Sequence, residues 1–545
     1  MNKNYHSGMS RRGLLRSGGS AAAGLAGLAL VGCGDDSTSS PSSKDATAKT
    51  GASPSATEAP RSGGTLTAAQ VSDVSFGTGY PFVSLAENVY LNYQPVEAMI
   101  RYRDSLKPEL NLVDLYEFSA DKLKLTARLK PNLRFHNGQA VTPEDVFFGI
   151  DLITDPKKYN VTGNFQLANQ ASLVKTMTKV DDRTMEFTFA SARPNINDLF
   201  AQLMVTQKSS YDRLRTGKDV QGTGAYKFVS WASGSSLTFA ANNEWHRKAE
   251  EGGPYLDQIV VKFFADADAE GLAYSAGDLD LVLSPSASVA KNYKAKKLTF
   301  NAPKTGLMYC GINVTNPALK DARVRQALFL AVDRDRIVNE LNEGFGKVTS
   351  QPWPETSPAF DPALEGAHYD PAKAKALLKE AGFTQDGPIP LDARAPTYTQ
   401  VASLLKENFE AVGVKVEIQP SEANAFLAKL RARQFKGLWV TTHAFSDLAP
   451  LTNFEQTFPY KIPNISYYES PDYLDLIQKL GTLDTNSPEA KIQYQRFNKL
   501  FTQDPWIIPV QPNSRIDLIS EKVRGFGQYF ITPSQSPQFA KIWKA

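Results

Sequence analysis

Residues 129–146 read LKPNLRFHNGQAVTPEDV, and this stretch decides the fold. Just before it, apolar residues alternate with charged or hydroxyl residues from Leu123 to Leu129, which predicts a half-buried strand. Asn137-Gly138 is a turn signal because both residue types tolerate positive φ. Thr142 is a suitable helix cap, Pro143 suits the first helical position, and Glu144 and Asp145 place negative charge in the first turn. A helix is therefore predicted to begin there. The stretch therefore predicts mixed α and β structure.

The rest of the chain keeps changing between apolar periods of 2 and 3.6 residues. Asp321 and Asp370 each precede apolar residues at helical spacing and predict two helix starts. A third helix is predicted from about Thr399 to Gly413, and residues 414–418 then alternate as a strand does. Helix, tight turn and strand are the unit of an open α/β layer.

Seven motifs occur in the order and approximate spacing of one protein family. They lie at residues 63–66, 129–146, 222–228, 277–280, 321–327, 331–334 and 369–374. In these motifs the chain resembles the extracytoplasmic solute-binding proteins of ABC importers, in the oligopeptide, dipeptide and nickel-binding family. One departure is Ala225, where the family usually has proline. The resemblance covers nearly everything from Gly63 to the C-terminus.

The resemblance implies an α/β fold of the periplasmic-binding-protein type, with two lobes joined by crossing strands and a ligand trapped between them by hinge closure. It also implies an extra subdomain in the first lobe. We assign the first lobe to residues 61–95, 200–305 and 513–545. The inserted subdomain is assigned to residues 96–199 and the second lobe to residues 306–512.

The N-terminus predicts export and lipidation. Arg11 and Arg12 precede a moderately apolar segment, as in a twin-arginine signal, and Leu30-Val31-Gly32-Cys33 resembles a bacterial lipobox. The alternative is a short transmembrane anchor, but this weakly apolar segment falls short of the roughly 20 residues that span a bilayer. We therefore assign residues 1–33 to a lipoprotein signal. Residues 34–62, rich in Ser, Thr, Ala and Pro, are assigned to a disordered tether.

Cysteine usage and charge narrow the class further. The chain has 2 cysteines. If Cys33 carries lipid, Cys310 has no intramolecular disulfide partner. The formal charge of +3 includes four basic and no acidic residues within the first 32 positions, so it falls to −1 for the chain from Cys33 onward. A nearly neutral net charge argues against nucleic-acid binding. We also expect a monomer that carries no cofactor.

Residues 437–450 most resemble the ligand-binding stretch of the family, where peptide-binding relatives commonly read W-x-x-D-Y-x-D-P. If Asp447 matches the second aspartate, Ala444 replaces the first, and a peptide ammonium group lacks its carboxylate. If the alignment slips by three residues, Asp447 itself meets the ammonium group. Trp439 and Phe445 in this stretch have aromatic faces on which a ligand can stack. The predicted ligand-binding residues are Trp439, His443, Phe445, Asp447 and Asn513, with Tyr80 and Phe82 as the alternative site on the first lobe.

Other functions have weaker support. Ser288-Val289-Ala290-Lys291 and Lys304-Thr305-Gly306 imitate motifs of penicillin-binding proteins, but the element that should separate them is missing. The 5 histidines show no paired spacing for a metal site. The sequence therefore predicts a non-enzymatic receptor, lipid-anchored outside the cytoplasm, that feeds the permease of an ABC importer. Its expected ligand is a peptide or amino-acid-derived compound, followed by an oligosaccharide or glycoside and then a metal chelate.

Overall fold

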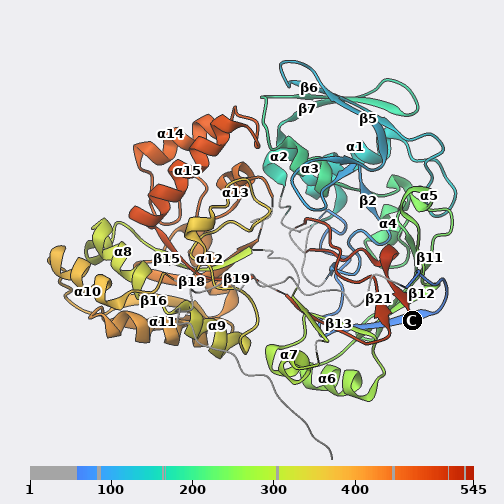
Figure 1. Cartoon of the computed structure of the whole chain (residues 1–545). Coiled ribbons are helices and arrows are strands. Elements are labelled where there is room, and N and C mark those ends of the chain that lie inside the picture. Colours follow the sequence, from blue (N-terminus) through green and yellow to red (C-terminus); the bar gives the residue numbers. More distant parts are fainter. Residues whose placement is uncertain are drawn as a thin grey trace, which may run out of the picture. The chain divides into compact units, whose positions relative to one another are not determined.

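The structure is a computed structural model (Figure 1). It describes residues 58–82, 88–161, 165, 167–296, 298–301, 306–366, 368–444, 448–513, 515–532 and 535–545. The chain divides into two units, residues 1–50 and 51–545, and all described residues belong to the second unit. Arg11, Arg12 and Cys33 therefore lie outside the described residues, as do Phe445 and Asp447.

The first large sheet has seven strands in the order β10-β11-β12-β1-β13-β20-β14. Strand β1 runs parallel to β12 and β13, and the other pairings are antiparallel. Helices α6 (Ala267–Ala276) and α7 (Ala287–Lys294) follow its strands. The strands are β10 Tyr226–Ala232, β11 Ser236–Ala241, β12 Gln258–Phe263, β1 Thr65–Gln70, β13 Leu281–Leu283, β20 Ile516–Ile519 and β14 Thr299–Asn301.

The deciding stretch of sequence lies beside a smaller, four-stranded antiparallel sheet. Strand β6 ends at Leu129, and the amide of Gly138 donates to the carbonyl of Phe135 (2.8 Å), which closes the predicted turn. The Thr142 amide donates to Asp145 Oδ2 (3.0 Å) at the start of α1, so the predicted helix start is confirmed. The elements are β5 Val113–Phe118, β6 Lys124–Leu129, β8 Thr184–Phe189, β7 Val174–Lys179, α1 Pro143–Thr154, α2 Ala168–Ser172 and α3 Ile196–Gln202.

The second large sheet has five strands in the order β17-β16-β18-β15-β19. Strand β16 runs parallel to β17 and β18, and β15 is antiparallel to β18 and β19. Helices α8 to α12 contact its strands or each other (Figure 1). The strands are β17 Val416–Ser421, β16 Ile389–Arg394, β18 Leu438–Ala444, β15 Gly306–Ile312 and β19 Ile507–Asn513.

The predicted helix starts in this part are confirmed. The Asp321 side chain accepts a hydrogen bond from the Arg323 amide, and the Asp370 side chain accepts one from the Lys373 amide. The third predicted helix is α11. The strand that follows, β17, begins two residues later than expected, because the Val414 amide donates to the Phe409 carbonyl at the end of α11. The helices are α8 Ala322–Ala331, α9 Arg334–Asn342, α10 Pro371–Glu380, α11 Thr399–Ala411, α12 Ala423–Ala432, α13 Pro450–Gln456, α14 Pro471–Leu480 and α15 Pro488–Gln503.

Shorter elements connect these layers. The remaining strands are β2 Glu97–Ala98, β9 Met204–Val205, β3 Ile100–Arg101, β4 Glu109–Leu110, β21 Val523–Arg524 and β22 Trp543–Lys544. The remaining helices are α4 Tyr211–Leu214 and α5 Lys248–Glu251, with 3₁₀ turns at Pro156–Tyr159, Lys208–Ser210, Pro317–Leu319, Pro362–Leu364 and Phe539–Lys541.

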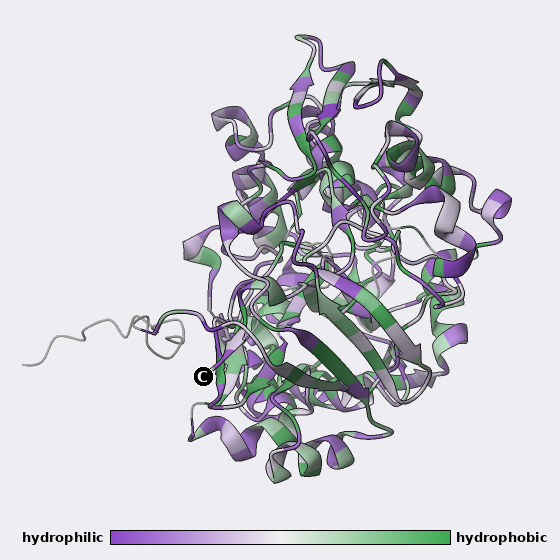
Figure 2. Ribbon diagram, turned by 90° about the vertical axis from the view of Figure 1, so that its right-hand side faces the viewer, coloured by the Kyte–Doolittle hydropathy of each residue, from purple (hydrophilic) through white to green (hydrophobic). Residues whose placement is uncertain are grey.

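Each large sheet has its own hydrophobic core. One core joins the seven-stranded and four-stranded sheets, and a second surrounds the five-stranded sheet. Figure 2 shows hydrophobic residues, in green, running along the strands. The second core contains three fully buried tryptophans, Trp353, Trp439 and Trp506, and the free thiol of Cys310. The residue boundaries of the two lobes stay a prediction.

Candidate functional site

Three strand ends meet at one edge of the five-stranded sheet. Ligands of open α/β sheets bind beyond the carboxyl ends of parallel strands. Strand β16 ends there at Arg394 and β18 ends at Ala444. Gly306, the first residue of β15, pairs with both Ala444 and Asn513. The fold therefore brings His443 and Asn513, which the sequence analysis singled out, to one edge of the sheet.

Among the described residues, Arg394 has no acidic partner at this edge. Its guanidinium lies over the ring of Tyr398, 4.9 Å from the ring centre. Its Nε atom is buried and has no hydrogen-bond partner among the described residues. The neighbouring acid, Asp392, instead pairs with Lys429 (2.6 Å). An arginine fork recognises a carboxylate through two parallel N–H donors, so this side chain can bind a ligand carboxylate.

Thr442 belongs to the same edge through a side-chain hydrogen bond. Its hydroxyl lies 3.0 Å from the hydroxyl of Tyr398, which holds the ring beneath Arg394. Neither Arg394 nor Tyr398 was predicted as a site residue from the sequence. A signal was present in the sequence, because Ile389, Leu391 and Ala393 alternate as in a strand and Arg394 follows them, where polar side chains of an α/β sheet reach the ligand edge.

Trp439 lies in the core. Its side chain is 0% exposed, and its indole stacks on Phe435 with ring centres 4.9 Å apart. The same indole lies against Gly311, where an added Cβ would come within 2.1 Å of the ring. Neighbouring side chains and backbone occupy the stacking surface that the sequence analysis assigned to a ligand.

His443 is also held by the protein. Its Nδ1 atom lies 2.8 Å from the Ala444 carbonyl oxygen, and its Nε2 atom lies 3.3 Å from the Tyr460 hydroxyl. Burial lowers the pKa of His443 to about 4. The imidazole is therefore neutral at neutral pH and fixed at the sheet edge.

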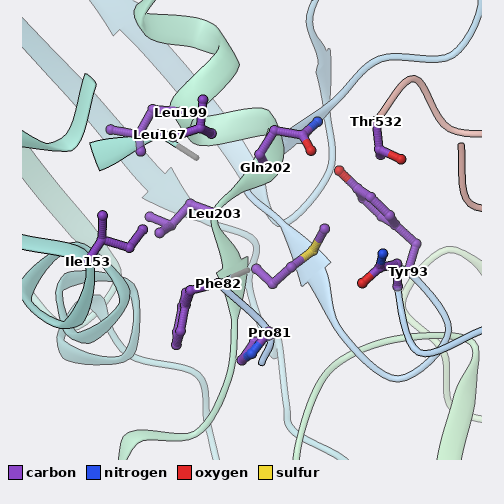
Figure 3. A pocket seen from close by; sticks show the side chains of 11 residues that line it. Pro81, Phe82, Tyr93, Ile153, Leu167, Leu199, Gln202, Leu203 and Thr532 are labelled. Atoms are coloured by element: carbon purple, nitrogen blue, oxygen red, sulfur yellow. The ribbon is translucent and has the colours of Figure 1, made fainter. Parts of the chain in front are cut away.

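Tyr80 and Phe82 differ in their access to space. The Tyr80 hydroxyl is buried and donates to the Leu91 carbonyl (3.2 Å). Phe82 lines a cavity of about 30 Å³ together with Tyr93, Gln202 and Leu203 (Figure 3). That volume holds about one or two water molecules, so in this structure the cavity has no room for a peptide.

A polar cluster joins α3 to the start of α13, directly after the predicted ligand-binding stretch. The Asp198 carboxylate accepts hydrogen bonds from the Ala449 amide (3.1 Å), the Thr452 hydroxyl (2.5 Å) and the Tyr102 hydroxyl (3.0 Å). Burial raises the pKa of Asp198 to about 6. Asn195 donates to both Thr452 (3.0 Å) and Glu455 (2.8 Å). These contacts link residues of the four-stranded-sheet part to residues that follow β18.

Lys304 and Thr305 lie outside the described residues, and the Ser288 and Lys291 side chains have other partners. The Ser288 hydroxyl shares a hydrogen bond with Ser286 (3.0 Å), and Lys291 pairs with Glu343 (2.6 Å). The described residues contain no group of three His, Cys, Asp or Glu side chains placed to hold a metal ion. Over the same ranges, no helix is both long enough and apolar enough to cross a membrane.

Comparison with known proteins identifies the class. Residues 107–458 match the bacterial extracellular solute-binding proteins, family 5 Middle. The chain belongs to this family, whose members are substrate-binding proteins. Heme-binding protein A of Haemophilus influenzae is 25% identical over 453 residues, which cover 76% of this chain and 81% of that protein. Glutathione-binding protein GsiB of Pectobacterium atrosepticum is 25% identical over 76% of this chain and 82% of its own length.

Solved structures show the same fold. HbpA2 from Haemophilus parasuis superimposes with a TM-score of 0.76 at 22% identity, covering 88% of this chain and 100% of that one. The substrate-binding protein CtaP from Listeria monocytogenes gives a TM-score of 0.74 at 21% identity, over 89% of this chain and 100% of its own. The protein therefore has the two-lobed fold of periplasmic binding proteins, as the sequence analysis expected.

Proposed function

We propose that this chain is the solute receptor of an ABC importer and that it captures a peptide or amino-acid-derived compound through a free carboxylate. The observation that carries the proposal is Arg394, a guanidinium at the carboxyl edge of the parallel strands with no acidic partner among the described residues. A ligand carboxylate would supply the missing acceptors and neutralise the charge. The receptor binds its ligand and catalyses no reaction.

Two relatives support this class of ligand. The glutathione-binding protein of Pectobacterium atrosepticum and di/tripeptide-binding protein 1 of Pseudomonas aeruginosa are both named for compounds built from amino acids. A chelator that carries carboxylates would use Arg394 in the same way, whereas a neutral sugar would leave its charge unpaired. Asn513 at the same edge offers an amide side chain to the ligand, and Phe445 and Asp447 follow β18 in sequence.

The test combines a change in the protein with a change in the ligand. A panel of di- and tripeptides is measured by calorimetry against the native chain and Arg394→Gln. The substitution should weaken binding of a free-acid peptide by about 10- to 100-fold, because hydrogen bonds to charged groups contribute about 1.5–3 kcal/mol. The C-terminally amidated peptide should bind the native chain weakly and lose little more in the variant.

Arg433→Gln is the matched control. The Arg433 guanidinium also lies over a tyrosine ring, 4.2 Å from the centre of Tyr467, and its Nε atom is also buried without a hydrogen-bond partner. It pairs with Glu469 (3.4 Å), so it already has an acidic neighbour. This variant should bind peptides as the native chain does. Equal binding of the free acid and the amide would refute the role of Arg394, and a panel without any binder would refute the peptide class.

We further propose that the mature protein begins at a lipidated Cys33 and is tethered outside the cytoplasmic membrane. The lipobox-like residues before Cys33 and the paired Arg11 and Arg12 support this. Cys33→Ala should leave an unlipidated protein in the soluble fraction or an uncleaved precursor in the membrane. Replacing both arginines by lysine should stop export by the twin-arginine route. Acyl modification of the Cys33→Ala chain would contradict the assignment.

A further inference from the structure

A second pocket, of about 620 Å³, lies apart from the strand ends just described. It is built by β3, β4, α5 and the segment before β22, and its first and last lining residues, Arg101 and Lys541, are more than 400 positions apart in sequence. Its wall is almost entirely charged or polar. The lining residues are Arg101, Arg103, Glu109, Leu110, Arg247, Glu250, Glu251, Gln528 and Lys541.

Glu251 lines this pocket, and four cationic side chains contact its carboxylate. One of its oxygens, Oε1, accepts from Arg101, Arg103 and Arg247, each at 2.5 Å. Its other oxygen lies 3.5 Å from Lys541 Nζ. These cations hold the pKa of the Glu251 carboxyl well below its usual range. One buried carboxylate therefore serves four positive side chains.

The other two carboxylates of the pocket do not balance this charge. Glu109 and Glu250 have side chains that are 45% and 62% exposed, and exposed ion pairs contribute little. Arg101 and Arg247, in contrast, have side chains only 2% and 5% exposed. Burial and the nearby Arg247 lower the pKa of Arg101, which is the direction expected where cations crowd together. Four cations of the lining face three carboxylates, so the lining carries one excess positive charge.

We propose that this pocket binds a phosphate-type oxyanion. A tetrahedral oxyanion offers several acceptors at once to guanidinium forks, and Arg103 and Lys541 at the pocket have side chains that are 18% and 21% exposed. The bound anion would share the cations that now converge on Glu251. No residue of the pocket belongs to the sheet edge of Arg394, so the two sites can be tested by separate substitutions.

The pocket lies close to the first described residues of the chain. The Gly63 amide donates to the carbonyl of Tyr255 (2.7 Å), four residues after Glu251. Arg524 lies 3.8 Å from Glu58. The oxyanion has two possible sources, a free phosphate compound or the headgroup of an anionic phospholipid. The headgroup source rests on the membrane tether proposed above, whereas the free phosphate source does not.

Two probes separate these sources. The full chain carrying Cys33→Ala, which lacks the lipid attachment site, is titrated with inorganic phosphate at constant ionic strength. The same chain is then sedimented with vesicles of phosphatidylglycerol or of phosphatidylcholine. Saturable phosphate binding without vesicle binding supports a free oxyanion. Binding to phosphatidylglycerol vesicles but not to phosphatidylcholine vesicles, with phosphate as a competitor, supports the headgroup as the source of the oxyanion.

Variants show whether the pocket is responsible. Arg103→Gln with Lys541→Gln should weaken phosphate binding at least 10-fold, since two charge-assisted contacts are lost. Glu109→Gln should tighten it, because a competing carboxylate becomes neutral. Arg336→Gln, an exposed arginine paired with Glu340 (2.6 Å), is the control and should change nothing.

Two results would overturn the proposal. It fails if neither phosphate nor phosphatidylglycerol vesicles bind saturably at constant ionic strength. It also fails if the double variant and Glu109→Gln bind phosphate as the native pocket does. Circular dichroism confirms that each variant folds, and Glu109→Gln, at an exposed side chain, keeps the test valid if the double variant does not. Peptide binding in the same samples reports on Arg394 separately.

Discussion

Glu270, on α6, should make the protein less stable at alkaline pH. Its side chain is 0% exposed, and neither carboxylate oxygen has a hydrogen-bond partner among the described residues. Burial raises the pKa of Glu270 to about 7. A buried carboxyl without partners can remain neutral, but its ionisation is unfavourable because the charge leaves water without compensation.

The sign of the effect follows from proton linkage. The carboxyl has a pKa of 4.5 in the absence of burial and about 7 in the folded protein. Between these values the folded chain binds a proton that the unfolded chain has lost, so stability is present below about pH 4.5 and is lost as pH rises through about 7. A shift of this size corresponds to about 2–3 kcal/mol between pH 5 and pH 8.

The assay is urea unfolding of the native chain and Glu270→Gln at both pH values. The amide stays neutral, so its free energy of unfolding relative to the native chain should improve by about 2–3 kcal/mol between pH 5 and pH 8. Asp268→Asn is the matched control, because Asp268 is an exposed acid on the same helix. The reasoning is refuted if the difference between Glu270→Gln and the native chain is the same at both pH values.

Three further predictions concern the second core and its contact with α3. Gly311→Ala should lower the free energy of unfolding by about 1–3 kcal/mol in urea titration, because its Cβ would lie 2.1 Å from the Trp439 indole; an unchanged midpoint would contradict this packing. Thr452→Val should destabilise by about 1–3 kcal/mol, since the buried Asp198 loses a hydroxyl donor, and a stability within error of the native value would contradict it. His443 should show no titration between pH 5.5 and 8 by NMR, because its pKa lies at about 4; a midpoint near 6.5 would place the ring in water.

The sequence predicted more about local structure than about the site. Thr142, Asp321 and Asp370 were recognised as helix starts because a cap bonds backbone amides only two or three residues away. Trp439 was considered for ligand stacking, yet Gly311 and Phe435 cover it. Hydrophobic character predicts that a tryptophan avoids water, but it does not say whether protein or ligand covers the ring.

By itself, the sequence determined the α/β class, the helix starts and the family, since all of these reside in short motifs and their spacing. Only the tertiary structure decided which side chains lack partners. Within the described part of the chain Arg394 has no acidic partner, because Asp392, two residues away, pairs with Lys429. The cationic pocket exists because Arg101, Glu251 and Lys541 converge from segments 150 and 290 positions apart. Pairing and burial depend on distance in space, and separations of this size along the chain do not specify that distance.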